Sequence, residues 1–141
     1  MTRISSNKFS ANEKEIESLL KENESWKKAM SHITQEMNFL DLYLKADIFE
    51  DKSELHEELE EFVQQLENAR SENYQLIKEV HNHRYDIEGI LECEDIGCEV
   101  FYHEEHLKLE QRIGNFRNDF RNFKLQVFTA TGKWLRKSSD N

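Results

Sequence analysis

The chain has 141 residues and a formal net charge of −10, with 34% charged residues, 37% apolar residues and no proline. This length favours one domain, and this composition favours long, solvent-exposed helices over sheets. Such an acidic surface argues against binding to nucleic acid or to an anionic membrane, so we expect neither among the partners. The sequence lacks both a membrane-spanning apolar run and the apolar core of a signal peptide, so we expect a soluble, cytoplasmic protein.

Apolar residues recur at spacings of three and four along three successive stretches. The first stretch has Ile16, Leu19, Trp26, Met30, Ile33, Met37, Leu40 and Leu44, interrupted by Asn23. The second has Leu55, Leu59, Phe62, Leu66, Ala69, Asn73, Leu76, Val80, His83, Ile87 and Ile90. The third has Tyr102, His106, Leu109, Ile113, Phe116, Phe120, Phe123, Val127, Ala130 and Trp134. A seam with a period of about 3.5 residues is typical of helices that pack along their length with coiled-coil geometry.

The limits of these helices follow from capping signals and turns. Ser10, with Glu13 three residues later, indicates a capping box and a helix start near Ala11. We expect helices at about residues 11–49, 53–93 and 99–137, between flexible tails at 1–9 and 138–141. Short connections between long helices favour antiparallel neighbours. The sequence therefore predicts an all-α fold: a single domain at 10–137, an elongated antiparallel up-down-up three-helix bundle with coiled-coil heptad packing.

Charge is distributed unevenly between the second and third predicted helices. Residues Glu50 to Glu67 include eight acidic side chains and one lysine, whereas Gln111 to Lys137 include seven basic side chains and one acid. In an antiparallel pair these two segments lie side by side. We therefore expect the basic strip around Arg117, Arg121 and Lys124 to be neutralised inside the protein rather than to bind phosphate groups.

Cysteine and histidine gather in the stretch Glu92 to His106, at the expected turn between the second and third helices. Thiolates and imidazoles are the ligands that zinc prefers, so this cluster is the candidate metal site. Its members are Cys93, Cys98, His103 and His106, with His83 from the preceding helix. The heptad phase, however, points His83 and His106 into the core. The alternative interpretation is that both are polar core residues and that no metal binds.

The two cysteines allow two states. In a reducing compartment Cys93 and Cys98 are expected to remain free thiols. They flank only the four residues from Glu94 to Gly97, so a disulfide would close the turn if their Cα atoms came within about 7 Å. The surrounding carboxylates disfavour a thiolate, which argues against a reactive cysteine.

Motifs that carry catalysis are absent from the sequence. It has no glycine-rich phosphate loop, no Gly-x-Ser-x-Gly nucleophile elbow and no His-Glu-x-x-His zinc motif. No Glu-x-x-His pair of the di-iron type occurs either. We therefore expect a protein that is not an enzyme and that has no catalytic or cofactor-binding residues.

A second set of large apolar residues lies outside the predicted core seams. It consists of Phe39, Leu42, Phe49, Leu125, Phe128 and Leu135. Exposed phenylalanines gathered at one end of a bundle are typical of an interaction surface. We expect homo-oligomerisation, or docking of a partner helix, through this face. The alternative is that the helices wrap more tightly at this end and bury both faces.

Two segments share features with a known group of proteins. They are SWKKAMSHITQEMNFLDLYL at Ser25 to Leu44 and FYHEEHLKLEQRIGNFRNDFRNFK at Phe101 to Lys124. The His-Glu-Glu-His element and the phenylalanine-rich seam that follows it resemble small all-helical proteins predicted from genomes of marine and soil Bacteroidetes. That group has no assigned activity, so the resemblance implies an intracellular helical bundle and no particular function. The main expectation is therefore non-enzymatic protein association, with self-association first, and the alternative is a small zinc-binding protein.

Overall fold

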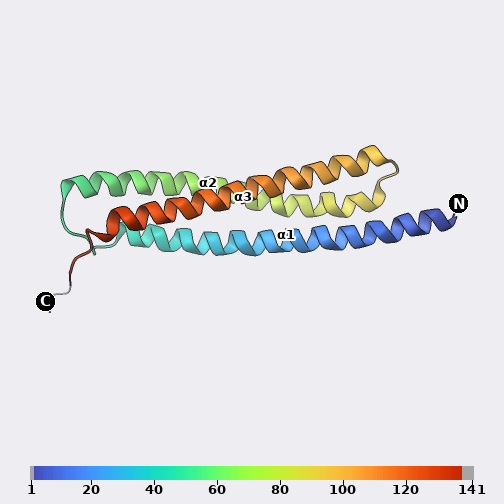
Figure 1. Ribbon diagram of the computed structural model, residues 1–141. Helices are drawn as coiled ribbons and strands as arrows, with labels where there is room; N and C mark the ends of the chain where they lie inside the picture. Colours follow the sequence, from blue (N-terminus) through green and yellow to red (C-terminus); the bar gives the residue numbers. More distant parts are fainter. Residues whose placement is uncertain (1, 138–141) are drawn as a thin grey trace. The chain divides into compact units, whose positions relative to one another are not determined.

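The structure is a computed structural model that describes residues 2–137, with side chains from residue 13 onward. Three long helices follow one another in the chain: α1 (Thr2–Lys45), α2 (Ser53–Gly89) and α3 (Ile96–Gly132). Figure 1 labels these three helices, and a short 3-10 helix, η1 (Ile90–Glu92), follows α2 directly in the chain. No strand occurs in the described part of the chain, so the prediction of an all-α protein is confirmed.

The first helix begins earlier than the sequence indicated. It starts at Thr2 and runs through Ser10 without a break, whereas the predicted start was near Ala11. The stretch 2–10 contains neither glycine nor proline, so nothing in it breaks the helix. The tail predicted at 138–141 lies outside the described residues.

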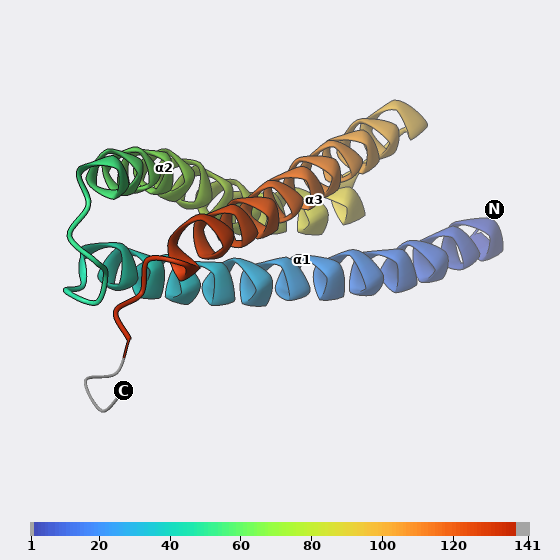
Figure 2. The ribbon, with the colours of Figure 1, turned by 60° about the vertical axis from the view of Figure 1, so that its left-hand side comes forward.

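The connection between α1 and α2 pairs with the chain that follows α3. The amide of Glu50 donates to the carbonyl of Trp134 at 2.7 Å, and the amide of Arg136 donates to the carbonyl of Ile48 at 2.8 Å. Phe49 and Leu135 form an antiparallel bridge between these two bonds. Figure 2 shows the segment after α3, drawn in red, next to the connection between α1 and α2. These contacts satisfy backbone groups that a helix would otherwise pair, so α1 and α3 end several residues before their predicted limits of 49 and 137.

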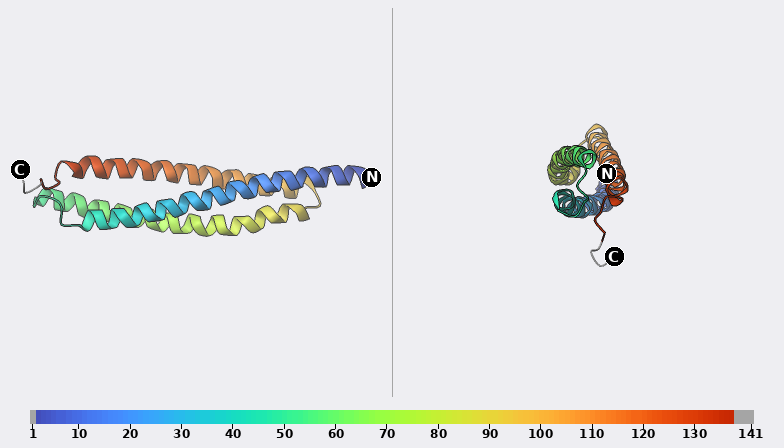
Figure 3. Two further views of the ribbon diagram at one scale, coloured as in Figure 1. Left: turned by 90° about the horizontal axis from the view of Figure 1, so that it is seen from below. Right: turned by 90° about the vertical axis from the view of Figure 1, so that its left-hand side faces the viewer.

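The connection between α2 and α3 contains a disulfide and a helix cap. Cys93 and Cys98 are bonded, with Cα atoms 5.6 Å apart. The carboxylate of Asp95 accepts a hydrogen bond from the amide of Cys98 at 2.8 Å, which is the geometry of an N-cap. The cap starts α3 at Ile96 rather than near residue 99. Figure 3 shows the short link between the yellow end of α2 and the start of α3.

The described residues form two compact units, each containing part of every long helix. Unit 1 comprises 2–31 and 75–114, and unit 2 comprises 32–74 and 115–137. Unit 1 buries Ile16, Trp26, Met30, Leu76, Val80, Ile87, Ile90, Leu109 and Ile113, with the polar residues Asn23, His83 and His106. Unit 2 buries Ile33, Met37, Leu40, Leu44, Phe49, Leu55, Phe62, Leu66, Phe116, Phe120 and Val127, with Asn73 and Thr131. Most of these positions belong to the three apolar seams of the sequence.

None of the described helices combines the length and the apolarity that crossing a bilayer requires.

Candidate functional site

Unit 2 exposes a set of large apolar side chains. Phe39 is 58% exposed, Leu42 70% and Leu125 59%, and Phe128 and Leu135 are about 40% exposed. The prediction that these five residues lie outside the core is confirmed. Their exposure makes this surface the first candidate for contact with another molecule.

Phe49 does not belong to this surface, and the expectation that it is exposed is wrong. Its side chain is 6% exposed because the bridge to Leu135 turns it toward the core. It packs edge-to-face against Tyr43, with ring centroids 5.3 Å apart. Phe39 and Phe128 also contact the Tyr43 ring, at 6.2 and 5.5 Å. The Tyr43 ring therefore packs against both exposed phenylalanines, Phe39 and Phe128.

The Tyr43 hydroxyl is fixed by a directed hydrogen bond. The hydroxyl of Thr131 donates its single hydrogen to the carbonyl of Val127 at 2.8 Å. Because that hydrogen is used, the Tyr43 hydroxyl must be the donor in its 2.7 Å contact with the Thr131 hydroxyl. This chain of bonds joins α1 to α3 and holds the tyrosine ring in place.

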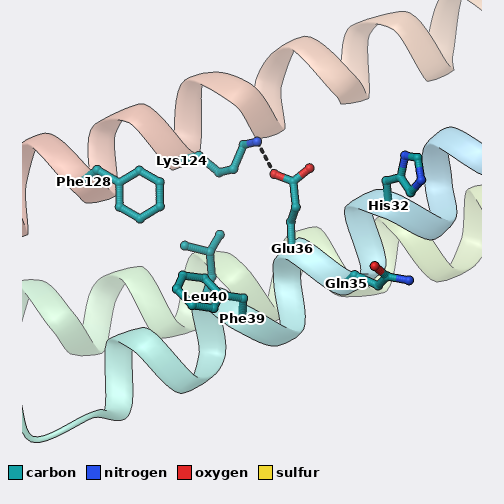
Figure 4. A pocket seen from close by; sticks show the side chains of 7 residues that line it. All are labelled: His32, Gln35, Glu36, Phe39, Leu40, Lys124 and Phe128. Carbon is teal, nitrogen blue, oxygen red and sulfur yellow. Dashed lines mark hydrogen bonds and ion pairs between the residues drawn. The ribbon is translucent and has the colours of Figure 1, made fainter.

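A groove of about 500 Å³ opens beside these aromatic rings in unit 2. It is lined by His32, Gln35, Glu36, Phe39, Leu40, Lys124 and Phe128 (Figure 4). Figure 4 shows Phe39 and Leu40 on α1 and Phe128 on α3, with an ion pair between Lys124 and Glu36 that joins the two helices. The groove therefore combines apolar walls with a charged contact.

The basic strip of α3 is not neutralised by α2 as the sequence suggested. Phe62 of α2 packs against Phe123 of α3, so the two segments are neighbours, but among the described residues no ion pair joins 50–67 to 115–137. Lys124 instead reaches Glu36, because this side of α3 faces α1. Arg117 and Arg121 are exposed on α3 and are left with no acidic partner in the described part of the chain. They give this part of α3 a basic character.

Unit 1 contains a buried pair of histidines in direct contact. His83 of α2 and His106 of α3 are 4% and 3% exposed, as the heptad phase predicted. Nε2 of His83 lies 2.9 Å from Nδ1 of His106. On the outer side of the pair, Nε2 of His106 lies 3.3 Å from a carboxylate oxygen of Glu22 on α1. The pair therefore links all three helices of unit 1.

Two further side chains complete the surroundings of the pair. Trp26 stacks on the His106 ring, with centroids 4.6 Å apart. Nδ1 of His83 lies 3.6 Å from a carboxylate oxygen of Asp86, one turn further along α2. Burial lowers the pKa of His83 below its ordinary value of 6.5, and a positive charge on His106 lowers it further, whereas Asp86 opposes the shift. The site therefore resists protonation of His83.

The five candidate zinc ligands do not form one cluster. The structure brings His83 and His106 together, but it bonds Cys93 to Cys98, and neither sulfur is then a free thiolate. His103 is partly exposed and lies 3.5 Å from Glu15 of α1. In residues 2–137 no group of three or more His, Cys, Asp or Glu side chains is arranged to hold a metal ion. The sequence prediction of free thiols also differs from the bonded state.

Sequence reasoning missed Glu22, Asp86 and the stacking of Trp26. Asp86 lies three residues after His83, a spacing that places both on one helix face, so the sequence contained this signal. The position of Glu22 against His106 depends on how α1 packs against α3, and no local pattern in the sequence reveals it.

Similarity to known proteins assigns neither site. The chain matches no known protein family, no curated protein and no solved structure. The groove and the histidine pair are therefore interpreted from their own geometry.

Proposed function

We propose that the chain acts by non-enzymatic protein–protein association, and that the groove of unit 2 binds an acidic amphipathic helix of a partner protein. The observation that carries the proposal is the exposure of Phe39 and Phe128 on the walls of a groove rather than singly on a flat surface. Amphipathic helices dock in such grooves by inserting apolar side chains at spacings of three and four. The Tyr43 contact pre-organises both rings, which lowers the entropic cost of binding.

Charge determines which kind of helix fits. Arg117 and Arg121 have no acidic partner within the described residues and lie on α3, the helix that provides one wall of the groove. Acidic side chains beside the apolar anchors of a docking helix would be attracted to these guanidinium groups. In a symmetric dimer through the same groove, the basic side chains of the two copies would face each other. We therefore place a partner helix ahead of a second copy of this chain.

The proposed scaffold for this groove is an antiparallel up-down-up bundle with heptad packing. Within unit 1, contacts between α1 and α3 rise together along the sequence, from Glu15 with His103 to Glu22 with His106. The contact of Glu79 with Arg112 and that of His83 with His106 run in opposite senses on α2 and α3. Both trends are those of the proposed topology.

Selection from a displayed library of amphipathic helices tests the docking proposal. The library fixes leucine or phenylalanine at positions i, i+3 or i+4 and i+7 and varies the rest, and the whole chain is the target. We expect the selected helices to be enriched in Asp and Glu, and to bind about tenfold more weakly to Phe39→Glu/Phe128→Glu. Basic or neutral selected helices would overturn the choice of an acidic partner.

One control variant and one further test variant separate loss of docking from loss of folding. Leu107→Glu changes an apolar residue of unit 1 that is 60% exposed, close to the 58% of Phe39, and should bind the selected helices like the wild type. Arg117→Glu/Arg121→Glu alters exposed side chains alone and should weaken binding of acidic helices by a similar factor of about ten. Docking at this site would be refuted if Phe39→Glu/Phe128→Glu and Arg117→Glu/Arg121→Glu both bound the selected helices as tightly as the wild type does.

Molar mass by light scattering addresses self-association. We expect a monomer in the absence of a partner helix. A dimer that Phe39→Glu/Phe128→Glu converts to a monomer would identify the occupant of the groove as a second copy of the chain, and it would overturn the proposed partner while keeping the surface.

A further inference from the structure

The two buried histidines of unit 1 are not among the residues that line the groove. Their hydrogen-bond contacts determine how many protons the pair can hold. We infer that His83 and His106 form a single-proton site: the folded pair holds one proton, and a second proton breaks the contact between the rings. The site lies within unit 1. It makes the packing of unit 1 sensitive to pH.

Three contacts of the two rings call for a hydrogen on nitrogen. A carboxylate only accepts, so Nε2 of His106 must carry a hydrogen to bond Glu22 at 3.3 Å. One hydrogen must lie between Nε2 of His83 and Nδ1 of His106, which are 2.9 Å apart. A hydrogen is also favoured on Nδ1 of His83, which faces the Asp86 carboxylate at 3.6 Å. Two neutral imidazoles have two N–H groups, so one of these three places stays empty.

One added proton fills the third place. The singly protonated pair has three N–H groups, which serve Glu22, the contact between the rings and Asp86. A pair that is protonated twice has four N–H groups, and its two facing nitrogens then both carry hydrogens. Two donors cannot share a 2.9 Å contact, so the rings must separate. The observed geometry therefore fits one proton per pair.

Groups from α1 stabilise a single positive charge on the pair. Glu22 supplies a carboxylate at the outer nitrogen of His106. Trp26 presents the face of its ring to the same imidazole, with centroids 4.6 Å apart, and aromatic faces attract cations. Because Trp26 is 7% exposed, separation of the two histidine rings would disturb a buried part of unit 1.

On the His83 side of the histidine pair, residues of α2 and α3 line a cavity of about 300 Å³. Its lining consists of Glu79, Asn82, His83, Asp86, Glu105, Lys108, Leu109 and Arg112. Arg112 is paired with Glu79 through two hydrogen bonds, and Lys108 lies 3.6 Å from Glu105. The positive charges of Arg112 and Lys108 are therefore largely compensated by the carboxylates of Glu79 and Glu105. The cavity is open, so water can deliver protons to His83.

The lowered pKa of His83 agrees with this proton count. Its causes are burial, in first place, and repulsion by a positive charge on His106, which is the condition after the first proton has bound. The carboxylates of Asp86 and Glu105 act in the opposite direction but do not cancel the effect. Binding of a second proton is therefore disfavoured relative to an ordinary histidine.

Nuclear magnetic resonance of the chain labelled with ¹⁵N-histidine counts the protons without any substitution. Between about pH 8 and about pH 5, we expect His83 and His106 to take up one proton together. Uptake of two protons by the pair in this range, with the rings still in contact, would overturn the single-proton site. Displacement of the shared proton by added Zn²⁺ at neutral pH would overturn it as well.

Chemical denaturation across the same pH range provides a second readout. Below the unfolded-state pKa of about 6.5, the unfolded chain holds two protons on these histidines and the folded pair holds one. As the pH falls below about 6.5, the unfolding constant of the wild type should therefore rise, by about tenfold more for each pH unit than the unfolding constant of His83→Gln. His81→Gln is the matched control and should keep the wild-type slope. Equal slopes for the wild type and His83→Gln would overturn the proposal.

Discussion

Units 1 and 2 contain segments of the same three helices with a similar spacing of buried residues, yet their polar cores differ in kind. Unit 1 buries two imidazoles, His83 and His106, whose charge depends on pH. Unit 2 buries a hydroxyl and an amide, Thr131 and Asn73, whose hydrogen bonds involve no titrating carboxylate or imidazole. We therefore expect the residue type at a few seam positions to make the core of unit 1 sensitive to pH and the core of unit 2 insensitive to it.

The outer surfaces of the two units also differ, although both expose large apolar side chains. Phe101 and Leu107 in unit 1 are 54% and 60% exposed, much like Phe39 in unit 2 at 58%. Phe39 lines a groove with other apolar side chains, whereas the cavity of unit 1 beside His83 is lined mainly by charged and polar groups. Exposure alone is thus a weak signal for docking, and its combination with a groove is a stronger one.

Truncation of core side chains should have the largest effect and should test whether the two units are separate in stability. Leu66 in unit 2 and Ile87 in unit 1 are both 0% exposed. We expect Leu66→Ala and Ile87→Ala each to lower the free energy of unfolding by about 2–5 kcal/mol, because each leaves a cavity in a packed core. Hydrogen exchange should show the greater loss of amide protection in the unit that contains the substitution.

A uniform loss of protection from both substitutions would contradict this expectation. It would mean that the two units open as one cooperative body despite their different cores. Leu107→Ala is the control for both variants, because its exposed side chain should change stability by less than about 0.5 kcal/mol.

Removal of the disulfide should have the next largest effect and should act on unit 1. Cys93 and Cys98 are separated by 5 positions, so the closed loop is short. The loop-entropy relation gives about 2 kcal/mol for a loop of this size. Cys93→Ser/Cys98→Ser should therefore lower the free energy of unfolding by about that amount, measured by denaturation under non-reducing conditions. If the wild type showed no difference in stability with and without a reductant, the contribution of the bond would be refuted.

Much of the fold was predictable because it depends on a periodic pattern. The seam positions of the sequence became the buried residues, and Asn23 and Asn73, which interrupt them, are buried too. The helix ends were less predictable. The sequence favoured helix through Phe49, but pairing of residues 48–50 with the segment after α3 gave those residues other hydrogen-bond partners. Such a contact between distant segments leaves no periodic signal.

The candidate sites were predictable in part. The exposed apolar face and the inward direction of His83 both followed from helical phase. The groove depends on how the side chains of α1 and α3 pack, and the contact of Glu22 with His106 depends on the relative register of those helices. Register between helices is set by all the packed side chains together, so it could not be obtained from any single motif.

Each unit contains one buried asparagine whose side-chain nitrogen donates a hydrogen bond, so the two residues can be compared directly. Asn23 of unit 1 donates to the carbonyl of Val80 at 2.9 Å, and Asn73 of unit 2 donates to the Thr34 hydroxyl at 2.8 Å. The side-chain oxygen of Asn73 is buried without a hydrogen-bond partner among the described residues. We expect Asn23→Leu to destabilise by about 1–2 kcal/mol and Asn73→Leu to cost about 1 kcal/mol less, because it also removes an unsatisfied oxygen. Equal losses in thermal denaturation would contradict the difference.

The smallest expected effect concerns a surface ion pair of unit 1. Arg112 donates two hydrogen bonds to the Glu79 carboxylate, at 2.7 and 2.6 Å, and this contact lowers the pKa of Glu79 below its ordinary value of 4.5. Both side chains are partly solvated, so Arg112→Gln should cost less than about 1 kcal/mol at neutral pH. A lowered carboxyl pKa stabilises the folded state above the unfolded-state value and loses that effect as the pH falls through the folded-state value.

The difference in stability between wild type and Arg112→Gln should therefore be constant near neutral pH and should shrink below about pH 4.5. The histidine pair is expected to act in a different pH range, because it should lower the free energy of unfolding as soon as the pH falls below about 6.5. The two pH windows separate the two contacts within unit 1. A difference that persisted unchanged in acid would show that Arg112 stabilises unit 1 through the packing of its aliphatic stem rather than through its charge.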